Sequence, residues 1–208
     1  MKWTTAVSKL ADVAQGCEHA NSLPTELNLF RAEEAWVFGA LLGPQQDSED
    51  PTFVRVAVVV DLPEDECALF SRPQAGEFWL NASGLGKSPV QVLFRSAQAP
   101  VWNHLVERPV RFWAREEGLD HEALLQLRNG DGEALRPEAP TDGELRERLD
   151  RDLRASLEAL RRTATDYDGK RWARANHKKL GDALADAALG LLSLQDARDA
   201  LGANGLDA

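Results

Sequence analysis

Two continuous apolar runs of strand length dominate the first half of the chain, Ala35–Leu42 and Val54–Asp61. Both are rich in β-branched and aromatic residues, a composition typical of strands that are buried on both faces of a sheet. We therefore expect a core pair of strands over about residues 35–42 and 53–61. Gly43-Pro44 opens the polar loop between them.

Helical periodicity precedes this pair. Apolar residues at steps of three and four predict a helix over residues 4–19, with one stripe made of Trp3, Val7, Leu10, Ala14 and Cys17. After the pair, a short acidic helix or turn is expected over Glu64–Leu69. Glycines and prolines then interrupt residues 70–89, where nothing longer than Glu77–Leu80 is predicted.

Two more strands and two more helices are expected before residue 136. Val90–Arg95 and Pro109–Ala114 have strand composition, and Pro100–Glu107 between them is predicted as a short helix. Asp120 is expected to cap a helix that Asn129-Gly130-Asp131-Gly132 closes. The apolar residues that this helix should bury are Leu124, Leu125 and Leu127.

The pattern becomes purely helical after Arg136–Pro140. Thr141 and Glu144 have the spacing of a capping box. The apolar stripe that follows consists of Leu145, Leu149, Leu153, Leu157 and Leu160. We expect this helix to end near Thr165, with a turn at Tyr167-Asp168-Gly169. A second helix is predicted from about Lys170 to Ala200, which Gly181 and Gly190 break or kink. Its inward residues should be Trp172, Leu180, Leu184, Ala188, Leu191 and Leu192.

These elements predict an α+β fold, with a mixed β-sheet core and a C-terminal antiparallel helical hairpin. We expect an α+β domain over residues 1–136 and the hairpin, packed on it, over residues 141–202.

Composition and charge limit the partners and the cellular compartment that we expect for the protein. The chain has 208 residues and a net charge of −10, which disfavours bulk attraction to nucleic acid or to an anionic membrane. No apolar run is long enough to cross a bilayer, and the N-terminus lacks the apolar block of a signal peptide. Cys17 and Cys67 stand far apart, as expected for free thiols in a reducing cytoplasm. We therefore expect a cytoplasmic protein that makes no membrane contact.

Charge is unevenly distributed. Residues 33–66 hold nine acidic residues and one basic residue, Arg55, whereas residues 161–179 hold seven basic and two acidic residues. Two solvated faces of opposite sign explain this pattern, and a local anion or partner site on the basic segment is the alternative.

Several chemistries find little support. Gly84-Leu85-Gly86-Lys87-Ser88 ends like a phosphate-binding loop, but Asn81 stands where the motif needs its first glycine and a predicted strand follows instead of a helix. A flexible glycine turn is the better interpretation. There is no GxSxG motif, and the four histidines lack metal-ligand spacing. We expect no cofactor and no metal.

The order of elements at the start of the chain resembles that of the nucleotidyltransferase superfamily. This order is a helix, a strand ending in Phe38-Gly39, a polar loop and a second strand. That resemblance implies a serine after the glycine, an Asp-x-Asp pair on the second strand and a third carboxylate on a later strand, which hold two divalent ions. Here Ala40 replaces the serine, Arg55 and Ala57 lie on the second strand, and Gln91 takes the third position. The resemblance therefore implies a scaffold that has lost its metal site.

Two enzymatic alternatives remain open. Carboxylates at Asp47, Asp50 or Asp61 would serve a nucleotidyltransferase with a displaced site. The hairpin resembles a helical ribonuclease lobe marked by an Arg and a His a few residues apart, which Arg171 and His177 match. A basic solvated turn anchored by Trp172 is the structural alternative.

Tryptophan and arginine gather between residues 101 and 113, in Val101-Trp102-Asn103-His104 and Arg108-Pro109-Val110-Arg111-Phe112-Trp113. This pattern of residues is similar to that of uncharacterised proteins of GC-rich bacteria. A predicted anion pocket would use Arg55, Arg95, His104, Arg108 and Arg111, because arginine binds phosphate and carboxylate bidentately. Predicted partner-binding residues are Trp102, Trp113, Arg171 and Arg174. Core packing of Trp102 and Trp113 is the alternative.

Taken together, the sequence predicts a non-catalytic binding or regulatory protein on a degenerate nucleotidyltransferase-like scaffold. It would recognise a partner protein or a small anionic ligand, and a homo-oligomer is compatible with it. The competing hypothesis is an enzyme, with either of the two chemistries described above.

Overall fold

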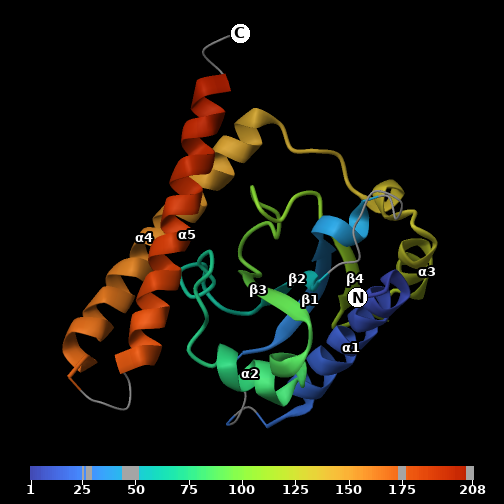
Figure 1. The fold of residues 1–208 in the computed structure, drawn as a ribbon, viewed down its shortest axis with the longest axis horizontal. Helices are drawn as coiled ribbons and strands as arrows, with labels where there is room; N and C mark the ends of the chain where they lie inside the picture. The colour runs from blue at the N-terminus through green and yellow to red at the C-terminus, as the bar shows by residue number, and fades with distance from the viewer. Residues whose placement is uncertain (25, 27–29, 44–51, 173–176, 205–208) are drawn as a thin grey trace. The chain divides into compact units, whose positions relative to one another are not determined.

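The fold is that of a computed structural model, which describes the chain except for residues 25, 27–29, 44–51, 173–176 and 205–208 (Figure 1). The chain divides into two compact units. The first consists of Met1–Leu62 and Gln74–Ala139, and the second of Pro63–Pro73 and Pro140–Ala208. The segment 63–73 thus groups with the helical hairpin rather than with the strands that flank it in sequence.

The first unit is built on a mixed five-stranded sheet with the strand order β3-β2-β1-β4-β5 (Figure 1). Its strands are β1 (Ala32–Phe38), β2 (Val54–Val60), β3 (Val90–Ser96), β4 (Val110–Ala114) and β5 (Gly118–Leu119). β2 and β3 are parallel and all other pairs are antiparallel. The predicted α+β fold with a mixed sheet is therefore confirmed.

Within its described residues, the first unit also contains three α-helices and three short 3₁₀ helices. The α-helices are α1 (Trp3–Ser22), α2 (Gly76–Ala82) and α3 (His121–Asn129), and the 3₁₀ helices are η1 (Gly39–Leu42), η2 (Leu85–Lys87) and η3 (Gly132–Leu135). The predicted stripe of α1 is confirmed, since Trp3, Val7, Leu10, Ala14 and Cys17 are all buried. Both cysteines are free thiols.

Helices α1 and α2 cover one face of the sheet. Phe94 of β3, which is in register with Val58 of β2, stacks edge-on against Trp79 of α2, with ring centroids 5.5 Å apart. Trp113 of β4 donates its indole hydrogen to Glu18 of α1 at 3.3 Å.

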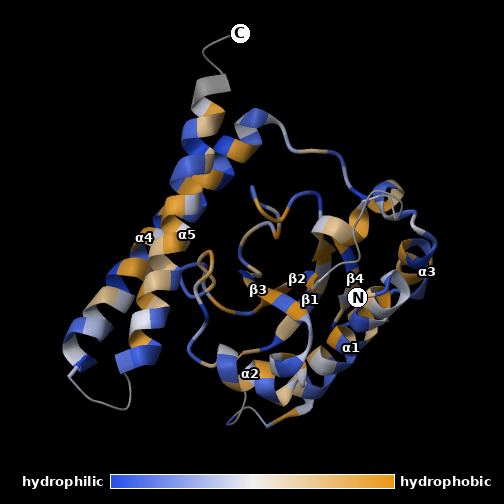
Figure 2. Ribbon diagram, viewed as in Figure 1, coloured by the Kyte–Doolittle hydropathy of each residue, from blue (hydrophilic) through white to orange (hydrophobic). Residues whose placement is uncertain are grey.

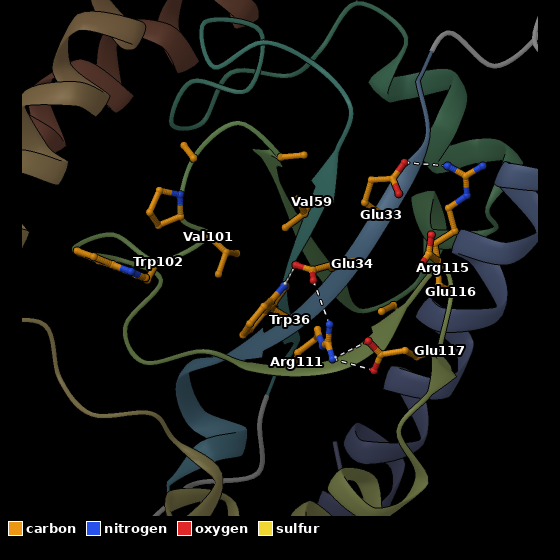
Figure 3. Close-up of a pocket in the computed structure, with 14 residues that line it drawn as sticks. Glu33, Glu34, Trp36, Val59, Val101, Trp102, Arg111, Arg115, Glu116 and Glu117 are labelled. Atoms are coloured by element: carbon orange, nitrogen blue, oxygen red, sulfur yellow. Dashed lines mark hydrogen bonds and ion pairs between the residues drawn. The ribbon is translucent and has the colours of Figure 1, made fainter.

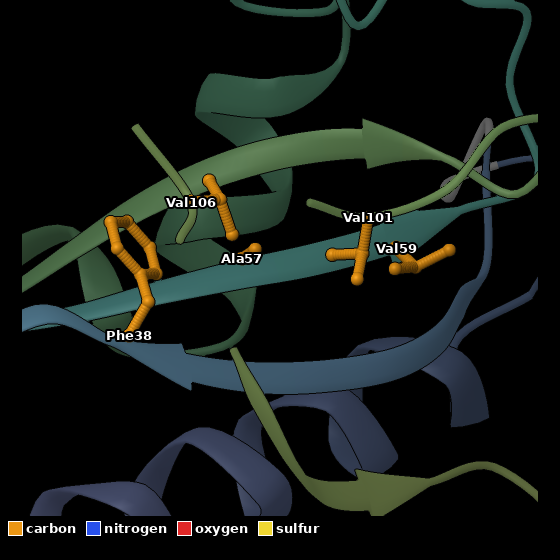
Figure 4. Packing of buried hydrophobic residues seen from close by; sticks show 5 residues of the cluster. All are labelled: Phe38, Ala57, Val59, Val101 and Val106. Atoms are coloured by element: carbon orange, nitrogen blue, oxygen red, sulfur yellow. The ribbon is translucent and has the colours of Figure 1, made fainter. Parts of the chain in front are cut away.

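The opposite face carries Phe38, Ala57 and Val59. Val101 and Val106, from the segment between β3 and β4, pack on these three residues (Figure 4). The remainder of this open face holds the candidate site.

The first core strand differs from its prediction at both ends. It begins at Ala32 and stops at Phe38. It stops there because Gly39 has φ of +78°, in the left-handed region, and leads into η1. β2 matches its prediction and is buried at every position except Arg55.

The short helix predicted over Pro100–Glu107 is absent. The side chain of Asn103 forms an Asx turn instead, and its Oδ1 accepts the backbone N–H groups of Leu105 and Val106 at 2.9 and 2.8 Å. A side chain that satisfies backbone donors in this way competes with helix formation.

The glycine-rich stretch 70–89 contains α2 and η2, which the sequence did not resolve. In α3, the cap at Asp120 is confirmed by a 2.9 Å hydrogen bond from the Ala123 N–H, and Gly130 ends the helix in the left-handed region. The predicted burial of Leu127 is correct, whereas that of Leu125 is wrong, because it is 59% exposed. Ala123 and Leu127, four residues apart, form the buried side.

The second unit is an antiparallel hairpin of α4 (Asp142–Lys170) and α5 (His177–Asn204), as predicted (Figure 1). Figure 2 shows hydrophobic and hydrophilic residues alternating along both helices. The capping box of Thr141 and Glu144 is present. The predicted turn at 167–169 is wrong, because α4 continues to Lys170.

Helix α5 also differs from its prediction in its inward face. Trp172 precedes the helix and is 83% exposed, and Leu192 is 53% exposed, so neither lies inward. Ala187 and Leu194 are buried instead. Residue 190 belongs to this buried side, where a glycine permits close approach of another backbone.

The segment 63–73 makes that close approach. Leu69 packs against Leu149 and Leu194. Its carbonyl group lies so close to Gly190 that a Cβ there would overlap the oxygen and lie 2.9 Å from the carbonyl carbon. Ion pairs from Glu64 to Arg151 and from Asp65 to Arg162 hold the start of the segment on α4.

Candidate functional site

The open face of the sheet carries a pocket of about 580 Å³ (Figure 3). Its walls come from β1, β2, β4, the segment after β3 and the turn after β4. The apolar wall consists of Trp36, Val59, Pro100, Val101 and Trp102. The charged side consists of Glu33, Glu34, Arg111, Arg115, Glu116 and Glu117.

Strand alternation places Glu34 and Trp36 on the same side of β1. The Trp36 indole donates its Nε1 hydrogen to Glu34 Oε2 at 2.9 Å. The ring also packs against the apolar cluster around Ala57 and Phe38. Trp36 is therefore held both by packing and by a hydrogen bond, and it remains half-buried at the pocket.

Arg111 of β4 joins the two sides of the pocket. Its Nη1 donates to Glu34 Oε1 at 3.2 Å, and its Nη2 donates to both carboxylate oxygens of Glu117, at 3.1 and 2.8 Å (Figure 3). Desolvation lowers the pKa of Arg111, but the hydrogen bonds and charges of Glu34 and Glu117 outweigh it and raise the pKa. The guanidinium is therefore charged and already bound by carboxylates.

The remaining charges leave the pocket negative. Arg115 pairs with Glu33 at 2.9 Å, and Glu116 adds a further carboxylate. Four glutamates face two arginines, so the lining carries two negative charges. A positively charged group fits this environment, and the same lining contains two tryptophans, the residue type that favours cation–π contacts most.

The residues of the predicted anion pocket lie in different places. Arg111 lines this pocket, whereas the Arg55 guanidinium lies over the Phe53 ring, 5.3 Å from its centroid. Arg95 is buried, and its Nε donates to the Val101 carbonyl at 3.1 Å.

Arg108 and His104 also lie outside the lining of this pocket. Arg108 donates to the Pro137 carbonyl at 2.7 Å and pairs with Glu133 at 2.8 Å. His104 is half-buried beside the Asx turn of Asn103. The structure therefore places one of the five predicted anion-binding residues, Arg111, in the pocket.

Of the predicted partner-binding residues, Trp102 forms part of the pocket wall. Trp113 is buried under α1. Arg171 follows α4, where it pairs with Asp168 at 3.1 Å and lies 4.9 Å from the Trp172 ring centroid. Arg174 lies outside the described residues.

The residues proposed for catalysis are also placed. His177 begins α5, with its ring centroid 6.1 Å from that of Tyr167. Asp61 accepts a 2.5 Å hydrogen bond from the Arg31 backbone N–H, and Asp47 and Asp50 lie outside the described residues.

Two negative findings apply to the part of the chain that the structure describes. No three histidine, cysteine, aspartate or glutamate side chains gather there as a metal site. No helix there is long and apolar enough to cross a membrane.

Sequence reasoning missed Glu34 and Glu117, the two partners of Arg111. The signal for Glu34 was its place two residues before Trp36, which puts both on one strand face once β1 is extended to Ala32. Glu117 comes to Arg111 through the tight turn between β4 and β5, for which Gly118 has φ of +77°.

Fold and pocket together define an α+β domain with a tryptophan-walled, acidic pocket. The chain belongs to the DUF7711 family, a domain of unknown function whose model matches residues 1–200. No curated protein and no solved structure matches the chain.

Proposed function

We propose that this chain is a non-catalytic binding protein whose pocket on the open sheet face takes a positively charged segment of a partner protein. The observation that carries the proposal is the state of Arg111. Its charge is already bound by Glu34 and Glu117, and the surrounding lining is negative. Of the two ligand classes that the sequence suggests, a partner protein therefore fits better than a small anion, which would have to displace Glu117.

A lysine or arginine side chain has the chemistry that this pocket needs. Its aliphatic stem would lie on the rings of Trp36 and Trp102 while its charged end meets the glutamates. A cation over an aromatic face contributes about 0.5–2 kcal/mol, depending on how far it is desolvated. The glutamates would add mainly specificity and a faster association rate.

The scaffold itself is proposed to be a degenerate nucleotidyltransferase-like core. Support comes from the order of α1, β1, β2 and β3, and from the side chains where that superfamily carries carboxylates. Arg55 and Gln91 are paired in register on β2 and β3, and Phe38, just before Gly39, is paired with Arg55 on the other side. The guanidinium of Arg55 and the amide of Gln91 provide no carboxylate for a divalent ion at these positions of β2 and β3.

Fluorescence anisotropy with two labelled decapeptides tests the binding proposal. One peptide alternates glycine with lysine and arginine, and the other alternates glycine with glutamate. We expect the basic peptide to bind in a saturable manner at low salt. The Trp102→Ala and Glu117→Gln variants should weaken that binding, whereas Trp172→Ala, a tryptophan of the other unit, should leave it unchanged.

The Glu117→Gln variant also distinguishes the two ligand classes, because it releases the side of Arg111 that Glu117 holds. If the pocket is an anion site, this variant should bind the acidic peptide more tightly. Binding of the acidic peptide by the wild type or by Glu117→Gln would overturn the proposal. Equal binding of the basic peptide by the wild type and by Trp102→Ala would overturn it as well.

A further inference from the structure

A second pocket of about 610 Å³ lies between α1 and the turn that joins α2 to β3. Its two walls approach closely at Gly16, where a Cβ would lie only 2.7 Å from the Ser83 carbonyl oxygen. Because α1 and α2 cover the face of the sheet opposite the acidic pocket, the two pockets lie on opposite sides of the sheet. The turn that forms one wall is the glycine-rich stretch Gly84–Ser88.

The charge of this pocket is opposite to that of the acidic one. Lys9, His19 and Lys87 line it together with one carboxylate, Asp12. Lys9 pairs with Asp12 at 2.8 Å, whereas Lys87 makes no ion pair with any residue that the structure describes. A lining with a surplus of positive charge stands out in a chain whose net charge is −10.

Ser88 supplies an independent observation. It lines the pocket, and its buried Oγ has no hydrogen-bond partner among the described residues. A buried hydroxyl without a partner costs free energy. A rotation of the Ser88 side chain about χ1 would turn this hydroxyl into the pocket, where a ligand oxygen would supply the missing hydrogen bond. In contrast, the Ser83 hydroxyl is already used, since it donates to the Leu80 carbonyl at 3.2 Å.

We propose that this pocket binds the phosphate group of a small phosphate monoester, through Lys87, Lys9 and the Ser88 hydroxyl. The arrangement differs from a P-loop, because Gly84 turns the chain with φ of +75° into the three-residue η2, and the strand β3 follows. Side chains would therefore provide the binding, and the remaining volume beside Gln15 and His19 accommodates the rest of the molecule.

Asp12 gives the proposal a distinctive consequence. A phosphate that approaches Lys9 competes with the Asp12 carboxylate for the same ammonium group. Removal of the Asp12 charge should therefore strengthen phosphate binding, whereas removal of the Lys87 charge should weaken it. An exposed pair of charges interacts by up to about 1 kcal/mol, which corresponds to a two- to fivefold change in affinity.

NMR titration of the ¹⁵N-labelled protein with adenosine 5′-monophosphate and with inorganic phosphate tests this, with adenosine as the uncharged control. We expect both phosphates to cause saturable shifts of the Gly84–Ser88 amides, and adenosine to cause none. Lys87→Ala and Ser88→Ala should raise the dissociation constant about two- to fivefold, and Asp12→Asn should lower it by a similar factor. Lys170→Ala, a matched charge removal in the other unit, should change nothing.

Three outcomes would overturn the inference: no saturable shift, shifts that adenosine reproduces, or equal effects of Lys87→Ala and Lys170→Ala. The last would indicate a general response to net charge. Since none of these residues lines the acidic pocket, the outcome is independent of the basic-peptide experiment.

Discussion

Replacement of Gly190 by alanine tests how the segment 63–73 is held on the hairpin. Alanine normally stabilises a helix interior relative to glycine, by up to about 1 kcal/mol. At this position of α5, however, the new methyl group would overlap the carbonyl oxygen of Leu69. The backbone of Leu69 has no flexible end that can rotate away, so the segment must shift as a whole.

The cost follows from what the shift disturbs. Leu69 is 4% exposed and packs against Leu149 and Leu194. Overpacking of a closely packed contact costs about 1–3 kcal/mol, and loss of the buried position of one leucine costs a comparable amount. Either exceeds the gain in helix propensity, so we expect Gly190→Ala to destabilise the protein by about 1–3 kcal/mol.

Gly181→Ala is the matched control in the same helix. A Cβ there meets only the Tyr167 ring, at 4.0 Å, an ordinary van der Waals contact. This variant should therefore be stabilised by up to about 1 kcal/mol. Urea unfolding followed by far-ultraviolet circular dichroism gives both free energies. If Gly190→Ala is stabilised as much as Gly181→Ala, the segment is not seated on α5 and the reasoning fails.

Two further predictions concern local contacts. Hydrogen bonds from the backbone and side chain of Thr141 lower the pKa of Glu144. The capping box therefore contributes stability above the unfolded-state pKa of this carboxyl, and this contribution is lost as pH falls through the lowered folded-state pKa. The wild type should exceed Glu144→Ala in thermal stability at neutral pH, and a difference that persists in strong acid would contradict this. Asn103→Ala should cost about 1–3 kcal/mol, because it removes the acceptor of two backbone N–H groups, and denaturant unfolding that shows no loss would argue against the Asx turn.

Local signals explain which elements could be predicted. The apolar run of β2 and the capping box at Thr141 correspond to elements that the structure contains. The early start of β1 could not be predicted from an apolar run, because Glu33 and Glu34 line the pocket rather than the core and are therefore charged. The Asx turn was hidden because it depends on one side chain, that of Asn103.

The pocket depends on contacts that sequence spacing does not contain. Trp102 and Arg111 were predicted from their residue types alone. The carboxylates that neutralise Arg111 reach it through pairing of β1 with β4, which brings Glu34 across 77 positions of sequence, and through a turn that brings Glu117 back. An arginine in isolation suggested an anion site, and its tertiary partners reverse the sign of the expected ligand.

The indole N–H signal of Trp36 in a ¹⁵N NMR spectrum tests the central claim most directly, because this group donates to Glu34 inside the pocket. We expect the basic peptide to shift this signal in a saturable manner, and a nucleoside triphosphate with magnesium to leave it unchanged. A saturable shift with the magnesium complex, together with no response to the basic peptide, would contradict it and would favour a nucleotidyltransferase with displaced carboxylates.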